Sequence, residues 1–117
     1  MRNMSFSLTT EQVRNRTKTV TRRLGWNFLK VGDILNACVK CQGLKKGERV
    51  EKICQIRVVS TRRERLFDIV TAIGDERELR KEGFPNLSSR DFVDMFCEAN
   101  NCERDQVVNR IEFEYLK

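Results

Sequence analysis

The chain of 117 residues has no histidine and only one proline and one tryptophan. Histidine is the side chain that most readily exchanges protons near pH 7, so acid–base chemistry here must use other groups. The sequence has no Gly/Ser-rich linker and no repeat, and its apolar runs reach two or three residues. A membrane-spanning helix needs roughly 20 apolar residues, and no apolar region follows the charged start as in a signal peptide. We therefore expect one soluble cytoplasmic domain over residues 1–117, with no membrane contact.

Charge is unevenly distributed along the chain. The net charge is +6, and residues 1–65 carry 16 Lys and Arg against 5 Asp and Glu. Residues 66–117 carry 7 against 12. This asymmetry predicts a basic face built by the first half, suited to a polyanion such as RNA or a nucleotide phosphate. The alternative is a solvated surface with no partner.

The five cysteines are odd in number and the expected context is intracellular, so we expect no disulfide framework. One hypothesis joins a C-x-x-C pair and a C-x4-C pair in a four-thiolate zinc site, formed by Cys38, Cys41, Cys97 and Cys102. The other treats Cys38 and Cys54 as small apolar residues within strands. We favour the second, because one such spacing is a weak signal and no histidine can complete the site. No metal or cofactor is expected.

Hydrophobic periodicity predicts an α+β fold. Alternating segments indicate strands, and segments with a period near 3.6 indicate helices. Capping-box patterns mark two helix starts, Thr9 with Gln12 and Ser88 with Asp91. Strands are predicted over residues 5–8, 19–23, about 34–40, about 50–60 and 110–116, and helices over 9–16, 66–73 (ended by Gly74), 75–81 and from 88 to about 99. A small, mostly antiparallel barrel of about five or six strands with peripheral helices fits this order best.

The most distinctive stretch is Thr17-Lys18-Thr19-Val20-Thr21-Arg22-Arg23. Three hydroxyls, one amine and two guanidinium groups fall within seven residues, close to a predicted short helix. A lysine beside a threonine hydroxyl is one of the few ways to build a nucleophile and a base without histidine. The same residue types also form phosphate-binding edges. The residues alone leave both interpretations open.

Four segments in order give the chain a resemblance to the ASCH domain, a branch of the PUA-like superfamily. Residues 18–23 are similar to the family signature GxKxxExR, and residues 29–35, Leu-Lys-Val-Gly-Asp-Ile-Leu, resemble its turn-and-strand segment. Residues 82–84, Glu-Gly-Phe, precede a helix of the expected type, and residues 111–113, Ile-Glu-Phe, lie in a closing strand. The resemblance implies a single ASCH/PUA-like domain with a small PUA-like barrel.

Two departures from the signature are informative. Arg16 stands where the family has a glycine, which predicts a less tight turn. Thr21 stands where the signature has a glutamate, as in the small bacterial members that hydrolyse N4-acetylcytidine and related N4-acylated nucleosides. Those members are described as using a lysine, a threonine and a glutamate, which the resemblance places at Lys18, Thr21 and Glu82. Other family members are viewed as RNA-binding or RNA-processing modules.

In the enzymatic hypothesis, Thr21 is the nucleophile and Lys18 takes its proton, which requires a neutral amine. Nearby arginines and desolvation favour that neutral form. Glu82 orients the lysine or delivers a proton to the leaving nitrogen, and Arg23 anchors a carbonyl or phosphate oxygen. In a regular strand, residues 18 and 21 point to opposite faces. The hypothesis therefore predicts a turn or bulge near Lys18.

Two functions remain open at this stage. The first is hydrolysis of the amide of an acylated cytidine or a similar modified nucleoside, without a metal. The second is a non-catalytic RNA-binding module. Nothing in the sequence favours a further possibility, a small protein whose basic face binds an acidic protein partner. A monomer is expected. In the RNA-binding alternative, the phosphate or substrate contacts come from Arg22, Arg23, Lys45, Lys46, Arg62, Arg63 and Arg65.

Overall fold

The computed structural model describes residues 1–41, 43–71 and 75–117. These residues form five strands and four helices. The strands lie mostly in the first half and at the C-terminal end, and three of the helices lie between the last two strands. In chain order the elements are β1 (Asn3–Ser5), α1 (Thr10–Arg14), β2 (Val20–Arg23), β3 (Ile34–Cys38), β4 (Lys52–Arg65), α2 (Asp68–Thr71), α3 (Asp75–Glu82), α4 (Ser89–Asn100) and β5 (Val107–Tyr115).

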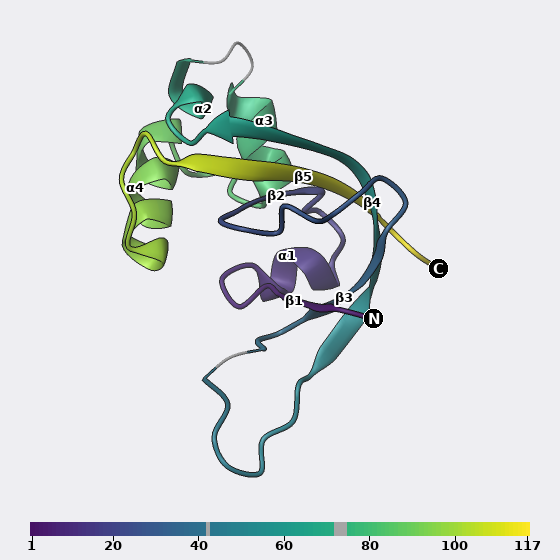
Figure 1. The fold of residues 1–117 in the computed structure, drawn as a ribbon. Coiled ribbons are helices and arrows are strands. Elements are labelled where there is room, and N and C mark those ends of the chain that lie inside the picture. The colour runs from purple at the N-terminus through teal and green to yellow at the C-terminus, as the bar shows by residue number, and fades with distance from the viewer. Residues whose placement is uncertain (42, 72–74) are drawn as a thin grey trace.

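The strands form one sheet in the order β1-β3-β4-β5-β2 (Figure 1). The β1–β3 pair is parallel and the other three pairs are antiparallel. Strands β4 and β5 are the long central pair, with a register shift between Val58 and Ser60. Within the described residues β1 and β2 remain the two edges. The α+β class and the mostly antiparallel pairing are confirmed, whereas closure into a barrel is not.

Several predicted boundaries shift. The first strand ends at Ser5, the first residue of the predicted segment 5–8, and β4 continues through the basic residues up to Arg65. The Thr9 side chain makes no capping hydrogen bond, so the first capping box is wrong. The second is supported, because the Ser88 hydroxyl accepts a hydrogen bond from the Asp91 N–H. The predicted 66–73 helix is represented by α2, while its end and the predicted stop at Gly74 lie outside the described residues.

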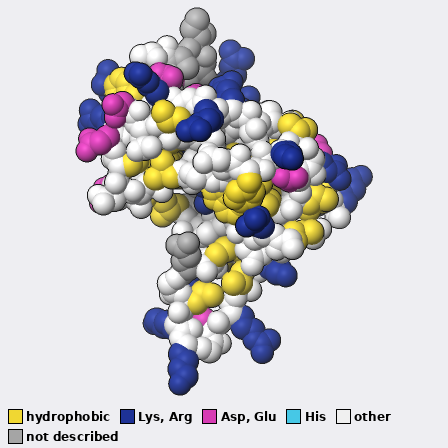
Figure 2. Space-filling view, viewed as in Figure 1, with side chains coloured by type: hydrophobic (Ala, Val, Ile, Leu, Met, Phe, Trp, Pro, Cys, Tyr) yellow, Lys and Arg dark blue, Asp and Glu magenta, His cyan; other side chains and the backbone are white. Residues whose placement is uncertain are grey.

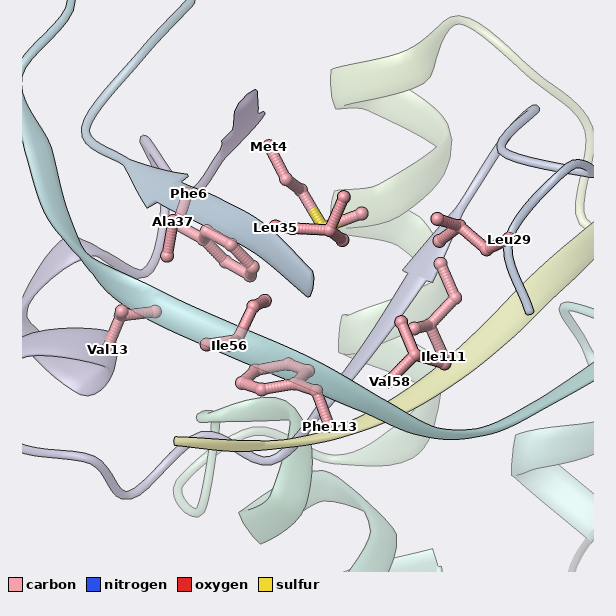
Figure 3. Packing of buried hydrophobic residues seen from close by; sticks show 10 residues of the cluster. All are labelled: Met4, Phe6, Val13, Leu29, Leu35, Ala37, Ile56, Val58, Ile111 and Phe113. Atoms are coloured by element: carbon pink, nitrogen blue, oxygen red, sulfur yellow. The ribbon is translucent and has the colours of Figure 1, made fainter. Parts of the chain in front are cut away.

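The main core lies against one face of the sheet. Inward-pointing residues of β3, β4 and β5 meet side chains of the N-terminal segment and α1 (Figure 3). Ile111 and Phe113 are buried as the alternating pattern of the last strand predicts, and Tyr115 is partly buried. The cluster comprises Met4, Phe6, Val13, Leu29, Leu35, Ala37, Ile56, Val58, Ile111 and Phe113.

A second core joins the helices to the far end of the sheet. Leu66, Ile69 and Leu79 pack there with Phe92, Val93, Phe96 and Val108. Helix α4 contributes the aromatic residues, on the face that its sequence spacing predicts. Among the helices described, none has the length and apolar character needed to cross a membrane. The two cores leave a pocket between them, lined by both Phe6 and Phe92.

Candidate functional site

A tight turn after α1 places Lys18 at the site. Arg16 has a φ of 63°, and the N–H groups of Thr17 and Lys18 both donate to the Gln12 carbonyl. This left-handed conformation is the one that glycine adopts most easily. The arginine therefore does not loosen the turn, contrary to expectation. Since β2 begins only at Val20, Lys18 escapes the strand alternation and lines the same pocket as Thr21.

The C-terminal end of α3 supplies the carboxylate. Gly83 has a φ of 95°, and the N–H groups of Gly83 and Phe84 donate to Arg80 and Leu79 in a Schellman pattern. The Lys18 Nζ donates to the Glu82 carbonyl over 2.5 Å and to its Oε1 over 3.1 Å. A cation at this position also opposes the partial negative charge of the helix end. The helix end and the lysine thus hold each other in place.

The second carboxylate oxygen of Glu82 is bound by Arg22. The Arg22 Nη1 donates to Glu82 Oε2 over 2.8 Å, and its Nη2 donates to Glu78 Oε1 over 2.8 Å. Nη2 also forms an ion pair with Glu64 Oε1 at 3.1 Å without hydrogen-bond geometry. Arg110 holds Glu78 from the other side through Nε and Nη2. The Arg22 side chain is 2% exposed, so its charge is directed to three glutamates of the protein.

Burial is the main influence on the Lys18 amine. The residue is 2% exposed, and burial lowers the pKa of Lys18 below its usual value. The Glu82 charge acts in the opposite direction, and the charges of Arg23 and Arg22 lower the pKa further. The amine is therefore neutral for a larger fraction of the time than a surface lysine at the same pH.

Arg23 holds the Thr21 side chain in the pocket. Its Nε donates to Thr21 Oγ1 over 3.0 Å, its Nη2 donates to the Ser5 carbonyl, and its guanidinium lies 4.8 Å from the centre of the Phe6 ring. Burial lowers the pKa of Arg23 to about 10, although the Glu82 charge raises it. The group is still a cation at neutral pH. Because Thr21 accepts from Arg23, its own hydroxyl proton is available to another acceptor.

These groups form the polar end of a pocket of about 420 Å³. The apolar wall of the pocket comes largely from α4, and residues of the N-terminal segment also line it. A volume of this size and a mixed polar and aromatic lining suit a small organic ligand. The polar end comprises Lys18, Thr21, Arg22, Arg23 and Glu82, and the apolar wall Phe84, Phe92, Met95, Phe96 and Ala99.

The remaining predicted basic residues do not line this pocket. Lys45 and Lys46 are exposed on the segment between β3 and β4, which projects from the body in Figure 1. Figure 2 shows Lys and Arg side chains at the tip of that projection. Arg62, Arg63 and Arg65 are exposed at the other end of β4. The structure thus separates the basic residues into two groups at opposite ends of a 14-residue strand.

Four of the five cysteines lie in two pairs. Cys38 lies beside Cys41, and Cys97 beside Cys102, so burial and the neighbouring thiol raise the pKa of Cys38 to about 11 and also raise that of Cys102. Across the residues that the structure covers, no three His, Cys, Asp or Glu side chains form a group that could hold a metal ion. The four-thiolate hypothesis therefore has no support from the geometry. Cys38 is buried as predicted, whereas Cys54 is only partly buried.

Sequence reasoning missed Glu78 and Arg110. Glu78 precedes Glu82 by four residues on α3, a spacing that places both carboxylates on one face of a helix and was therefore detectable. Arg110 is paired with Arg22 across β5 and β2, which only the strand register reveals. The aromatic wall comes largely from the predicted helix that begins near Ser88, but no local pattern in the sequence indicates that a pocket interrupts the core there.

No protein-family model matches the sequence, and no curated protein has a significant match to it. Solved structures do share its fold. An ASCH domain from Lactobacillus crispatus JV V101 superposes with a TM-score of 0.60 at 14% identity, over 97% of this chain and 78% of that one. The hypothetical protein PH0355 superposes with a TM-score of 0.63 at 16% identity, over 98% of this chain and 96% of that one. Protein EF3133 from Enterococcus faecalis V583, described with the family model DUF984, superposes with a TM-score of 0.63 at 12% identity, over 98% of this chain and 79% of that one. The chain therefore has an ASCH-like fold.

Proposed function

We propose that the pocket binds an N4-acylated cytidine or a similar modified nucleoside and hydrolyses its amide bond. The observation that carries the proposal is the convergence of Lys18, Thr21 and Glu82 in one pocket. They come from the turn after α1, from β2 and from the end of α3. An aromatic wall faces them, which suits the flat apolar surface of a nucleobase.

In the first step, the Thr21 hydroxyl attacks the acyl carbonyl carbon while its proton passes to the neutral Lys18 amine. The Arg23 guanidinium, already bonded to Thr21 Oγ1 over 3.0 Å, stabilises negative charge that develops beside this oxygen. Glu82 holds the Lys18 amine through its backbone carbonyl and its Oε1. It thus positions the base.

Collapse of the tetrahedral intermediate breaks the carbon–nitrogen bond, and the Lys18 ammonium returns its proton to the leaving N4 nitrogen. Cytidine leaves and the acyl group remains as an ester on Thr21. Lys18, neutral again, takes a proton from a water that attacks this ester. The carboxylic acid departs, the Thr21 hydroxyl regains its proton, and no metal is required.

One observation favours RNA contact as a second function. Lys45 and Lys46 are exposed on the projecting segment, away from the pocket. Such residues can contact phosphates without sequence preference. The two basic groups are separated along β4, which fits a local contact better than one continuous groove. RNA retention on a filter that falls steeply with salt supports this function, and no retention at low ionic strength refutes it.

The test of hydrolysis is incubation with N4-acetylcytidine and chromatographic detection of cytidine. Thr21→Val removes the hydroxyl and keeps the branched shape, and we expect it to lower the rate more than about a thousand-fold. Thr21→Ser keeps a hydroxyl and retains measurable activity. Thr19→Val serves as the matched control, because Thr19 is two residues away and does not line the pocket. Wild-type turnover no faster than that of Thr21→Val refutes the proposal.

A further inference from the structure

Charges in the buried cluster around Glu82 do not balance when every group is ionised. Three carboxylates face three guanidinium groups, and the Lys18 ammonium is a fourth cation. A cluster away from water is most stable when its charges compensate. This balance is reached when Lys18 is the neutral amine. The cluster comprises Lys18, Arg22, Arg23, Arg110, Glu64, Glu78 and Glu82.

Arg22 connects the two parts of this cluster. One side of its guanidinium binds Glu82, whose other oxygen accepts from Lys18. Its other side binds Glu78, which Arg110 holds through two further hydrogen bonds. The Arg22 and Glu82 side chains are 2% and 3% exposed, so little solvent screens these contacts. Arg22 is therefore fixed partly by Glu78, which Arg110 holds and which has no hydrogen bond to the Lys18 amine among the described residues.

We propose that Arg22 is a positioning residue that, held by Glu78 and Arg110, fixes the Glu82 carboxylate and, together with burial and Arg23, keeps Lys18 in its proton-accepting form. The chemical importance of this role rests on the proposed hydrolysis, whereas the charge arrangement can be tested without it. Arg22 takes the Oε2 of Glu82, which leaves only Oε1 for Lys18. Its positive charge close to the amine disfavours protonation of Lys18.

Burial and the charge of Arg23 act on the Lys18 amine in the same direction as Arg22, and each lowers the Lys18 pKa more than Arg22 does. The side chain of Arg23 adds a second positive charge, and the Lys18 Nζ lies 5.9 Å from the centre of the Phe84 ring. The Tyr115 hydroxyl donates to the Lys18 backbone carbonyl, with the Arg16 guanidinium over its ring. Arg62 is 60% exposed and lies 3.8 Å from Glu64. The charged or titratable groups facing the cluster are thus Glu82 and Glu78 from α3, Arg22 and Arg23 from β2, Glu64 and Arg62 from β4, Arg110 and Tyr115 from β5, Arg16 from the turn, and Cys41 near Arg23.

The experiment measures the Lys18 pKa directly by NMR titration of ¹³Cε-labelled lysine in the full chain. The Lys18→Met spectrum assigns the Lys18 signal, since it lacks that signal alone. Arg22→Gln removes a cation beside Glu82, and we expect the Lys18 pKa to rise. Glu78→Gln removes an anion that neutralises Arg22, so the pKa of Lys18 falls. Arg22→Lys keeps the charge and leaves the pKa of Lys18 near the wild-type value.

A matched control is Arg104→Gln, which removes an exposed arginine paired with Asp94 and leaves the Lys18 pKa unchanged. Opposite shifts in Arg22→Gln and Glu78→Gln support the proposal, because general loosening of the site shifts both variants toward the solvent value. Shifts of the same sign, or none, overturn it. If Arg22→Gln does not fold, the other two variants decide. A lower Lys18 pKa in Glu78→Gln together with a Lys18 pKa near the wild-type value in Arg22→Lys supports the proposal. Any other combination of these two results overturns it. Absence of N4-acetylcytidine turnover together with opposite shifts refutes the proposed function and leaves this inference intact.

Discussion

Replacing Gly83 with alanine perturbs the joint between α3 and the Lys18 turn. Gly83 has a φ of 95°, and an added Cβ lies 3.2 Å from both Cβ and Cγ of Gln12 and 3.6 Å from Cβ of Lys18. The positive φ alone costs about 1–2 kcal/mol for an L residue. The close approach to Gln12, whose Nε2 donates to the Gly83 carbonyl, adds about 1–2 kcal/mol of overpacking. We therefore expect Gly83→Ala to lower the free energy of unfolding by about 2–4 kcal/mol.

Gly32→Ala is the matched control, because Gly32 has the same φ of 95° and an added Cβ has no heavy atom within 4 Å. It carries the backbone cost without the packing cost. Urea unfolding of both variants, followed by tryptophan fluorescence, isolates the difference of about 1–2 kcal/mol, or about 1 M in the midpoint. Gly83→Ala should also impair hydrolysis, since Glu82 is its neighbour, while Gly32→Ala should not. Equal destabilisation of the two variants refutes the packing argument.

Three further predictions concern charged side chains. Glu82→Gln removes the carboxylate shared by Lys18 and Arg22, and urea unfolding should show a loss of about 3 kcal/mol, whereas a loss under 1 kcal/mol contradicts the pairing. Although burial acts in the opposite direction, the hydrogen bond from Arg110 and the charge of Arg22 lower the pKa of Glu78 to about 2. A depressed folded-state pKa stabilises the fold above the unfolded value of 4.5, so stability should fall from about pH 4.5 toward pH 2. Unfolding curves across this range should show a smaller fall in Glu78→Gln, and an identical fall contradicts the ion pair. Lys45→Ala with Lys46→Ala should weaken RNA retention on a filter and leave N4-acetylcytidine hydrolysis unchanged, and a loss of hydrolysis contradicts their placement away from the pocket.

Local patterns predicted much of the fold. The alternation at Ile111 and Phe113 located the last strand, and Ser88 located the start of α4, because both signals depend on neighbouring residues. The openness of the sheet could not be predicted, since it depends on which strands pair at long range. The capping box at Thr9 failed because the Thr9 N–H donates to the Phe6 carbonyl, while the Gln12 Nε2 donates to the Gly83 carbonyl, 71 residues away.

In the candidate site, too, some residues could be predicted from the sequence and others could not. The family resemblance placed Lys18, Thr21 and Glu82, and the structure brings them into one pocket. Composition suggested that Arg22 faces a phosphate. The side chain is instead held by glutamates from α3 and β4, which no local pattern around residue 22 could reveal. Buried ion pairs between distant segments are set by tertiary packing, so sequence spacing alone predicts them poorly.

The central claim is that Thr21 becomes acylated while Lys18 accepts its proton. The most direct measurement is rapid acid quenching of the protein during turnover of N4-acetylcytidine, followed by peptide mapping by mass spectrometry. The account predicts an acetyl group on Thr21, absent from Thr21→Val and strongly reduced in Lys18→Met. Cytidine release without any acetyl group on Thr21, under conditions that trap an acetyl ester on Thr21→Ser, contradicts it.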